Sequence, residues 1–312
     1  MSSRTKDKAA ARERVAAMRA EQARAARRRR VLLAGGSIGV VVVLLVALVV
    51  AKAAGLGSGG SGSGSGSTDS AQPAAAGTAV VNAVTGVPAT TLDEIGAGDV
   101  QAVPRKADAP ALTAGGKPQV LYVGAEYCPF CAAQRWPVVV ALSRFGTWAG
   151  LGQTTSASDD VYPDTATLSF HGATYSSDYV SFTGVETSGR TKVNGQYTPL
   201  DKLTAADQKT FQTYDQPPYI NGSAGSIPFL DLGGSFVSSG ASFDPQLLAG
   251  MSHRQIATAL SDPTSPVAKA VDGSANVLTA ALCEVTGQQP SAVCTAPGVA
   301  AAAKTLAQGN TS

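Results

Sequence analysis

The sequence predicts a mixed α/β domain that one N-terminal helix holds at a membrane. Three observations support this class. A charge-free run of 21 residues follows a strongly basic N-terminal arm. A short apolar strand candidate leads directly into a pair of cysteines and a helix. After that helix, strand and helix patterns alternate along most of the remaining chain, as expected of a domain that packs helices on a sheet.

The first 51 residues have the composition of a membrane anchor. Residues 1–30 carry eleven Lys or Arg and three acids, which leaves 13 basic and 19 acidic residues for the rest of the chain. Val31–Ala51 contains no charge, and at roughly 1.5 Å per helical residue it spans the ~30 Å hydrocarbon core. Basic flanks stay in the cytoplasm. We therefore expect a single-pass protein of the cytoplasmic membrane, with its N-terminus in the cytoplasm and its C-terminal domain outside.

Two alternatives apply to this segment. The small-x-small triplet Ala51–Ala53 has the form that signal peptidase cleaves, so the anchor is either retained or removed. The basic arm has the charge to touch RNA or anionic lipid, but a topology signal with a solvated helical arm explains it more simply. Because the excess of basic charge is confined to this arm, no nucleic-acid partner is expected.

The rest of the chain divides into three parts. Residues 52–77 form a Gly/Ser-rich linker that has no means to build a core. Residues 78–297 form the extracytoplasmic domain, and about 220 residues suffice for one well-buried domain with an insertion. Residues 298–312 are Ala-rich and are expected to be a flexible tail.

Periodicity and turn residues predict the elements of the domain in order. They are a short helix at 87–98, a buried strand at 119–123, a helix at 129–144, strands within 165–172 and 178–187, a helix within 198–215, a hairpin within 226–243 and helical patterns at 244–260 and 265–285. Gly146 ends the second helix, and Thr204 caps the third. Gly233 and Gly234 form the hairpin turn.

Cys128 and Cys131 lie three residues apart at the junction between strand and helix. Such a pair is a metal clamp, a structural disulfide or a redox couple. At a helix N-terminus, free backbone N–H groups and the helix dipole favour a thiolate, and Pro129 suits the first helical turn. A thiolate is the nucleophilic form of cysteine. The position favours a redox couple in which Cys128 attacks and Cys131 resolves.

The stretch "AEYCPFC" resembles the corresponding run of the thioredoxin superfamily, and its CPFC motif is similar to the glutaredoxin type. A second mark of that family is a cis-proline that faces the disulfide and precedes a hairpin, and "GSIPFLDLGG" matches it. The resemblance implies a thioredoxin-like fold, with an insertion after the CxxC helix and extra C-terminal helices. It implies that Pro228 shapes the substrate groove with Ile227 beside it.

A narrower resemblance covers about residues 87–294. These residues look like an uncharacterised bacterial and archaeal family with a thioredoxin-like fold, often membrane-anchored, which brings no established substrate. The sequence departs from thioredoxin at Tyr122, where many relatives place a buried acid that helps the second thiol lose its proton. Glu126 is a possible substitute, but we expect its side chain on the surface.

Aromatic side chains flank the thiols. Tyr127 and Phe130 are candidates for substrate contact, and Phe130 is expected to be exposed at the helix tip. Trp136 is expected to pack the helix onto the sheet instead.

Cys283 and Cys294 enclose a short polar loop, and in an oxidising compartment we expect them to form a structural disulfide. An electron-relaying second pair is the alternative. Four-cysteine zinc sites use two closely spaced pairs, and the ten residues between these two cysteines do not fit that pattern. His171 and His253 are expected to be ordinary surface or capping residues. No metal and no cofactor beyond the dithiol are predicted.

The sequence therefore predicts an enzyme of thiol–disulfide exchange that acts on exported cysteine-containing proteins. A quinone-coupled membrane enzyme could serve as its redox partner, because one anchor helix cannot supply that step internally. The competing hypothesis is a non-catalytic binding or scaffold module of the cell envelope, in which Cys128 and Cys131 form a static disulfide.

Overall fold

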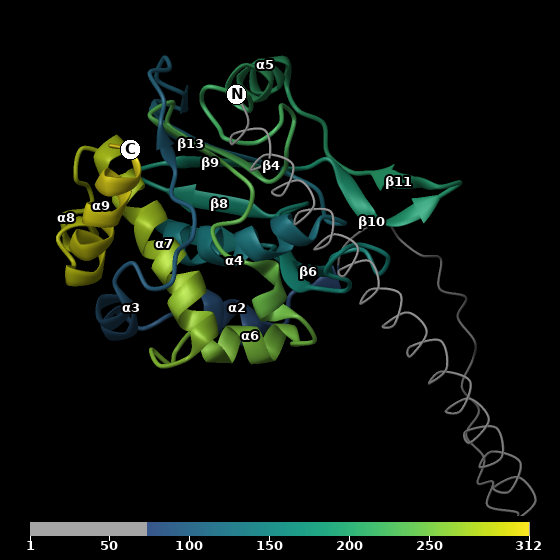
Figure 1. Ribbon diagram of the computed structural model, residues 1–312, viewed down its shortest axis with the longest axis horizontal. Helices are drawn as coiled ribbons and strands as arrows, with labels where there is room; N and C mark the ends of the chain where they lie inside the picture. Colours follow the sequence, from purple (N-terminus) through teal and green to yellow (C-terminus); the bar gives the residue numbers. More distant parts are fainter. Residues whose placement is uncertain (1–73, 312) are drawn as a thin grey trace, which may run out of the picture. The chain divides into compact units, whose positions relative to one another are not determined.

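The computed structural model describes residues 74–311, which form a mixed α/β structure with a central mixed β-sheet (Figure 1). The predicted basic arm, the predicted membrane helix and residues 52–73 of the predicted linker lie outside the described residues. Within 74–311, no helix combines the length and the apolar character needed to cross a lipid bilayer. The α/β class predicted from the sequence is confirmed.

The central sheet is built around one long strand, β4. Its members are β2 (Arg105–Lys106), β3 (Thr113–Ala114), β4 (Lys117–Gly124), β9 (Ser181–Glu186), β12 (Phe229–Leu232) and β13 (Phe236–Ser239). The strands β2, β13, β12, β4 and β3 follow one another with antiparallel pairing, and β9 pairs with β4 in parallel. The β12–β13 hairpin turns at Gly233 and Gly234, as predicted; both have positive φ, which glycine adopts without steric cost.

Alternating side chains of β4 enter two separate cores, because successive residues of a strand point to opposite faces. Val120 and Tyr122 belong to the larger core, which also contains buried residues of α4 (Pro129–Ser143) and α7 (Pro266–Val285). Leu121 and Val123 belong to the smaller core, which α5 (Ala205–Tyr214) covers with Phe211 and Tyr214. The sheet therefore has helices on both faces (Figure 1).

The segment between α4 and α5 contains more strands than the sequence predicts. The strands outside the central sheet are β1 (Ala74–Ala75), β5 (Gly146–Ala149), β6 (Gly152–Thr155), β7 (Ala166–Ser169), β8 (Thr174–Ser177), β10 (Ser188–Val193) and β11 (Gln196–Pro199). The order β1-β6-β7 forms one small sheet, and β5 pairs with β8. The β10–β11 hairpin projects beyond the central sheet (Figure 1). Asn194 and Gly195 in its turn both have positive φ, at 51° and 79°, as a type I′ turn requires.

The remaining helices and the 3-10 helix η1 contact α7, except α2, which contacts α4 and α6. They are α2 (Thr78–Thr85), α3 (Ala89–Ile95), η1 (Pro245–Leu248), α6 (His253–Ala259), α8 (Ser291–Cys294) and α9 (Pro297–Gly309). The helical pattern at 244–260 is divided into η1 and α6. Between them Gly250 has a φ of 73°, a left-handed conformation that does not continue a helix.

The prediction of a flexible tail at 298–312 is wrong, because α9 occupies most of this segment. Val299, Ala302 and Leu306 recur at helical spacing and are buried in the larger core. The N–H group of Gly298 donates to Asp93 Oδ1 at 3.0 Å, which ties the start of α9 to α3. The Ala-rich segment therefore contains an apolar helix face, and the burial of this face holds α9 against the rest of the domain.

Asp272 on α7 is fully buried, and neither of its carboxylate oxygens has a hydrogen-bond partner within residues 74–311. Burial raises the pKa of this carboxyl to about 8. A carboxyl whose folded-state pKa is raised stabilises the fold most at low pH, and this contribution is lost as the pH rises through the folded-state pKa.

We therefore predict that Asp272→Asn removes a pH dependence. Between about pH 4 and the folded-state pKa, the wild type loses stability relative to the variant by at most about 1.4 kcal/mol per pH unit. Urea unfolding of the full-length protein at pH 5 and at pH 8 measures this, with Asp159→Asn at an exposed position as the control. Parallel pH profiles for wild type and Asp272→Asn would contradict the assignment.

Candidate functional site

Cys128 is the N-cap residue of α4. Its backbone is extended, with φ −79° and ψ 122°, and its sulfur accepts a hydrogen bond from the backbone N–H of Cys131 at 3.4 Å. Pro129 occupies the first helical turn, where a missing N–H costs nothing. The CPFC motif thus places the Cys128 sulfur where it accepts a hydrogen bond from a backbone N–H group that has no partner within the helix.

The two thiols have opposite electrostatic surroundings. Cys128 retains 7% of its exposed surface and Cys131 none, and both are free thiols. A hydrogen bond from the Cys131 side chain lowers the pKa of the Cys128 thiol. Burial raises this pKa, whereas the Cys131 N–H and the positive charge of Arg135 lower it further. Burial raises the pKa of the Cys131 thiol well above its ordinary value, and the neighbouring Cys128 adds to this. Cys128 is therefore the more acidic thiol of the pair.

The Ile227–Pro228 segment lies beside the Cys128 sulfur. The register of the sheet brings it there, because Phe229 at the start of β12 pairs with Val123 near the end of β4. The Cys128 thiol donates to the Ile227 carbonyl at 3.8 Å, and the Ile227–Pro228 peptide bond is cis. Cys128, Ile227 and Pro228, which the sequence selects from distant positions, thus meet at one place.

The aromatic residues near the dithiol differ in exposure, and the predicted exposure of Phe130 and burial of Trp136 are confirmed. Phe130 is 39% exposed at the tip of α4, and its ring meets Tyr162 edge-on at 5.9 Å between ring centroids. Tyr127 is half-buried and stacks on Tyr197 of β11 at 4.0 Å. Trp136 is fully buried and donates to the Ala166 carbonyl at 3.1 Å, which confirms its packing role.

A buried ion pair that was not predicted from the sequence lies close to the dithiol. Arg135 follows Cys131 by four residues on α4, and Glu186 ends β9. Two hydrogen bonds of 2.8 and 2.7 Å join the guanidinium to the carboxylate, and a third of 2.8 Å reaches the Ala125 carbonyl. Both side chains are fully buried. Two features of the sequence pointed to this pair: Arg135 lies four residues after Cys131 on the same helix, and Glu186 ends a buried strand.

Glu126 corrects a second expectation. We expected it on the surface, but its exposure is only 2%. Its carboxylate accepts from Ser169 at 2.5 Å and from Thr154 at 3.3 Å, on two strands of the small sheet. Burial raises the pKa of this carboxyl. The small sheet supplies these partners, and its strands were largely missed in the sequence.

Tyr122, which stands where many thioredoxins have an acid, is also fully buried. Its hydroxyl has no hydrogen-bond partner within the described part of the chain, and burial raises its pKa well above the ordinary value. The ring needs Gly124 beside it, because a Cβ there would lie within 2.5 Å of the hydroxyl. This position therefore supplies no carboxylate to the dithiol.

The histidines form hydrogen bonds with groups other than the thiols. His171 Nδ1 lies 2.7 Å from Asp201 Oδ1, and both side chains are partly exposed. His253, the first residue of α6, is half-buried, with Nε2 2.8 Å from the Thr154 carbonyl and 2.9 Å from the Thr167 carbonyl. Residues 74–311 contain no group of three or more His, Cys, Asp or Glu that could hold a metal ion.

Cys283 and Cys294 form a disulfide in the structure. Their sulfurs are 1.97 Å apart and their Cα atoms 5.6 Å apart. The bond joins the C-terminal end of α7 to α8. This pair is thus held in the bonded state, in contrast to the two free thiols of α4.

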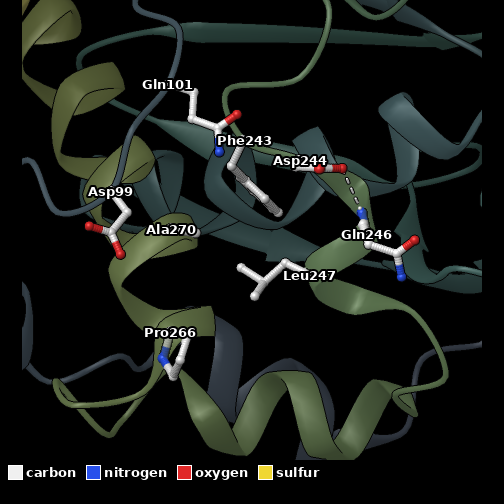
Figure 2. Close-up of a pocket in the computed structure, with 8 residues that line it drawn as sticks. All are labelled: Asp99, Gln101, Phe243, Asp244, Gln246, Leu247, Pro266 and Ala270. Atoms are coloured by element: carbon white, nitrogen blue, oxygen red, sulfur yellow. Dashed lines mark hydrogen bonds between the residues drawn. The ribbon is translucent and has the colours of Figure 1, made fainter. Parts of the chain in front are cut away.

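A surface pocket of about 510 Å³ lies elsewhere, and Figure 2 shows Leu247 among its lining residues. They are Asp99, Gln101, Phe243, Asp244, Gln246, Leu247, Pro266 and Ala270. Asp244 is the N-cap of η1 and accepts from the Gln246 N–H at 2.9 Å, so its carboxylate already has a structural role. Neither thiol of α4 lines this pocket.

The buried ion pair makes a testable prediction. Arg135→Met leaves the Glu186 carboxylate buried and unpaired, so we expect a loss of about 3–5 kcal/mol in the free energy of unfolding. The double variant Arg135→Met/Glu186→Leu should recover most of this loss. In both, the pKa of Cys128 should rise because the nearby cation is gone.

Urea unfolding measures the stability, and the pH dependence of alkylation measures the thiol. Arg190→Met is the control, because its ion pair with Asp164 is exposed and such pairs contribute about 0–1 kcal/mol. Equal losses for the two arginine variants would contradict the prediction.

Comparison with known proteins places this site within one family. A family model described as Domain of unknown function (DUF929) matches residues 104–284. The chain has no significant match among curated proteins or among solved structures. The matched segment contains Cys128, Cys131, Pro228 and both partners of the buried ion pair, and it covers more than half of the 312 residues. The chain belongs to the DUF929 family.

Proposed function

We propose that this protein is an extracytoplasmic thiol–disulfide oxidoreductase with a thioredoxin-like fold, anchored in the cytoplasmic membrane by residues 31–51. Three features support the fold: β4 leads directly into the dithiol helix α4, the β12–β13 hairpin follows Pro228 and pairs with β4, and helices cover both faces of the sheet. The substrates are exported proteins that contain cysteine.

One observation carries the proposal. The Cys128 sulfur caps α4, with a lowered thiol pKa, and lies 3.8 Å from the carbonyl of Ile227. A lowered pKa increases the thiolate fraction near neutral pH, and the thiolate is the attacking species in disulfide exchange. The Arg135 charge favours the ionised form of both thiols.

The exchange proceeds in two balanced steps. The Cys128 thiolate attacks one sulfur of a substrate disulfide, so a bond forms between the two proteins and the other substrate sulfur leaves with the electron pair. Cys131 then loses its proton and attacks Cys128, which forms the Cys128–Cys131 disulfide and releases the second substrate sulfur as a thiolate. The substrate gains two electrons and the dithiol loses two. The reverse sequence oxidises a substrate dithiol.

The competing function is a non-catalytic scaffold with a static Cys128–Cys131 disulfide. The low exposure of Cys128, at 7%, is the observation that favours it. Reactivity distinguishes the two functions, because a scaffold requires no thiolate.

We predict that reduced Cys128 alkylates with an apparent pKa below the ordinary cysteine value of about 8.5. The rate falls as the pH drops through this lowered pKa, because protonation removes the thiolate. Iodoacetamide labelling of the full-length protein in detergent between pH 4 and 10, read by peptide mass spectrometry, measures both thiols. Alkylation of Cys131 ahead of Cys128 would contradict the roles assigned here.

We also predict that Cys131→Ser traps mixed disulfides with cell-envelope proteins, because the resolving thiol is missing. Non-reducing gels of membranes from cells that express this variant should show reducible adducts. Cys128→Ser/Cys131→Ser is the matched control and should show none. A Cys131→Ser variant without adducts, together with ordinary alkylation kinetics, would favour the scaffold.

A further inference from the structure

Two buried hydrogen-bond donors close to the dithiol have no partner within residues 74–311. They are the hydroxyl of Tyr122 and the Nη1 group of Arg135. Both side chains are fully buried. A buried donor without a partner costs folding free energy, because it has lost its hydrogen bonds to water and gained none in return. Such groups are rare in folded proteins, and a role in the chemistry of a site is one reason for their presence.

The positions of these two donors converge near Cys131. Arg135 follows Cys131 by four residues on α4, so both side chains lie on the same face of that helix. Arg135 Cζ is 6.0 Å from the centroid of the Tyr122 ring. The Tyr122 hydroxyl lies beside Gly124, the last residue of β4, and Arg135 Nη2 donates to the carbonyl of the next residue, Ala125, at 2.8 Å.

The titratable groups around Cys131 and the ion pair come from α4, from β9 and from β4 with the loop that follows it. They are Tyr122, Glu126, Cys128, Arg135 and Glu186. Burial, Cys128 and Glu186 disfavour a thiolate at Cys131, and the positive charge of Arg135 favours it. Because both oxygens of Glu186 already bond to Arg135, the remaining Nη1 group of the guanidinium is the part that is left for another acceptor.

The proposed exchange needs a thiolate at Cys131 in its second step, although this thiol is fully buried. The Tyr122 hydroxyl stays protonated at neutral pH, because burial raises its pKa well above the ordinary value. A guanidinium likewise donates hydrogen bonds and accepts none. Neither group can act as a base for the thiol, but both can stabilise an anion. Hydrogen bonds to an ionised acceptor are roughly twice as strong as those between neutral groups.

We propose that the Tyr122 hydroxyl and Arg135 Nη1 are the hydrogen-bond donors that stabilise the Cys131 thiolate in the second step of exchange. This deepens the proposed function and rests on it. In the reduced state that the structure describes, neither donor bonds to a sulfur. When Cys131 loses its proton, its sulfur becomes an anionic acceptor in a region that holds two donors without partners.

The step is balanced without a protein base. In the first step the substrate releases one of its sulfurs as a thiolate. The proton of Cys131 passes through solvent to that thiolate, which leaves as a thiol. The Cys131 thiolate then attacks Cys128 and forms the internal disulfide, and the second substrate sulfur leaves with the electron pair of the broken bond. Tyr122 and Arg135 keep their protons throughout.

The variant Tyr122→Phe tests the proposal, because it keeps the ring in the core and removes only the hydroxyl. Reduced full-length protein in detergent reacts with oxidised glutathione, excess alkylating reagent stops the reaction, and mass spectrometry counts glutathione adducts and free thiols. Adduct formation at Cys128 should stay within about two-fold of wild type. Formation of the internal disulfide should be roughly ten-fold slower. Wild-type kinetics in both steps, or equal slowing of both, would overturn the proposal.

Tyr175→Phe is the matched control. The Tyr175 hydroxyl donates to the Leu142 carbonyl near the end of α4 at 2.8 Å, so this variant loses a hydrogen bond that is made. It should lower the midpoint of urea unfolding and leave both steps of exchange unchanged. Tyr122→Phe should leave the midpoint equal or higher, because it removes a donor that has no partner. A lower midpoint in Tyr122→Phe would show a packing role for the hydroxyl and would overturn the proposal.

Failure of the proposed function has a different signature. A wild-type protein that forms neither the glutathione adduct nor the internal disulfide is no oxidoreductase. The donors are then tested on the thiol alone, by NMR titration of the isotope-labelled Cβ of Cys131 in Cys128→Ala. Adding Tyr122→Phe should displace this titration by about one unit toward higher pH, because a lost donor disfavours the thiolate. Identical titrations would overturn the proposal.

Discussion

The double pairing of β4 is the constraint on which the site depends. Antiparallel pairing with β12 sets Val123 opposite Phe229, and parallel pairing with β9 sets Gly124 opposite Glu186. A shift of one residue in either register would turn every side chain of the shifted strand to the opposite face. The dithiol follows β4 directly in the chain. The two registers therefore place the Ile227–Pro228 segment on one side of it and the Glu186 carboxylate on the other.

The carboxylates buried near the thiols are costly to bury and have close hydrogen-bond partners, whereas the Tyr122 hydroxyl and Arg135 Nη1 have none within residues 74–311. Arg135 and Glu186 share two hydrogen bonds, and Glu126 accepts from two hydroxyl groups. An ion pair in such surroundings contributes little net stability over apolar residues of the same shape, but an unpaired member is strongly destabilising. A guanidinium near two thiols has an electrostatic effect that an apolar replacement would not have, which gives its burial a chemical rationale.

Sequence reasoning recovered the elements with strong periodicity or clear caps. The strand before Cys128, the helix after it, the Thr204 cap and the Gly233–Gly234 hairpin are present as predicted. It missed the short polar strands, whose pairing depends on distant segments, although Asn194–Gly195 is a hairpin signal that the sequence does contain. Glu126 and Glu186 were missed as buried site residues because their partners lie on elements that no local pattern identifies.

Two ion pairs, Arg190–Asp164 and Lys192–Asp159, join the β10–β11 hairpin to the loop 157–164. They differ from the buried Arg135–Glu186 pair in solvent exposure. Their side chains are 37% to 63% exposed. Dissolved ions screen such contacts over about 8 Å at physiological ionic strength, and much less screening reaches enclosed charges. The buried Arg135–Glu186 pair is therefore little affected by salt, whereas the two exposed ion pairs weaken as the salt concentration rises. A rise in ionic strength would therefore weaken the contacts between the β10–β11 hairpin and residues 157–164.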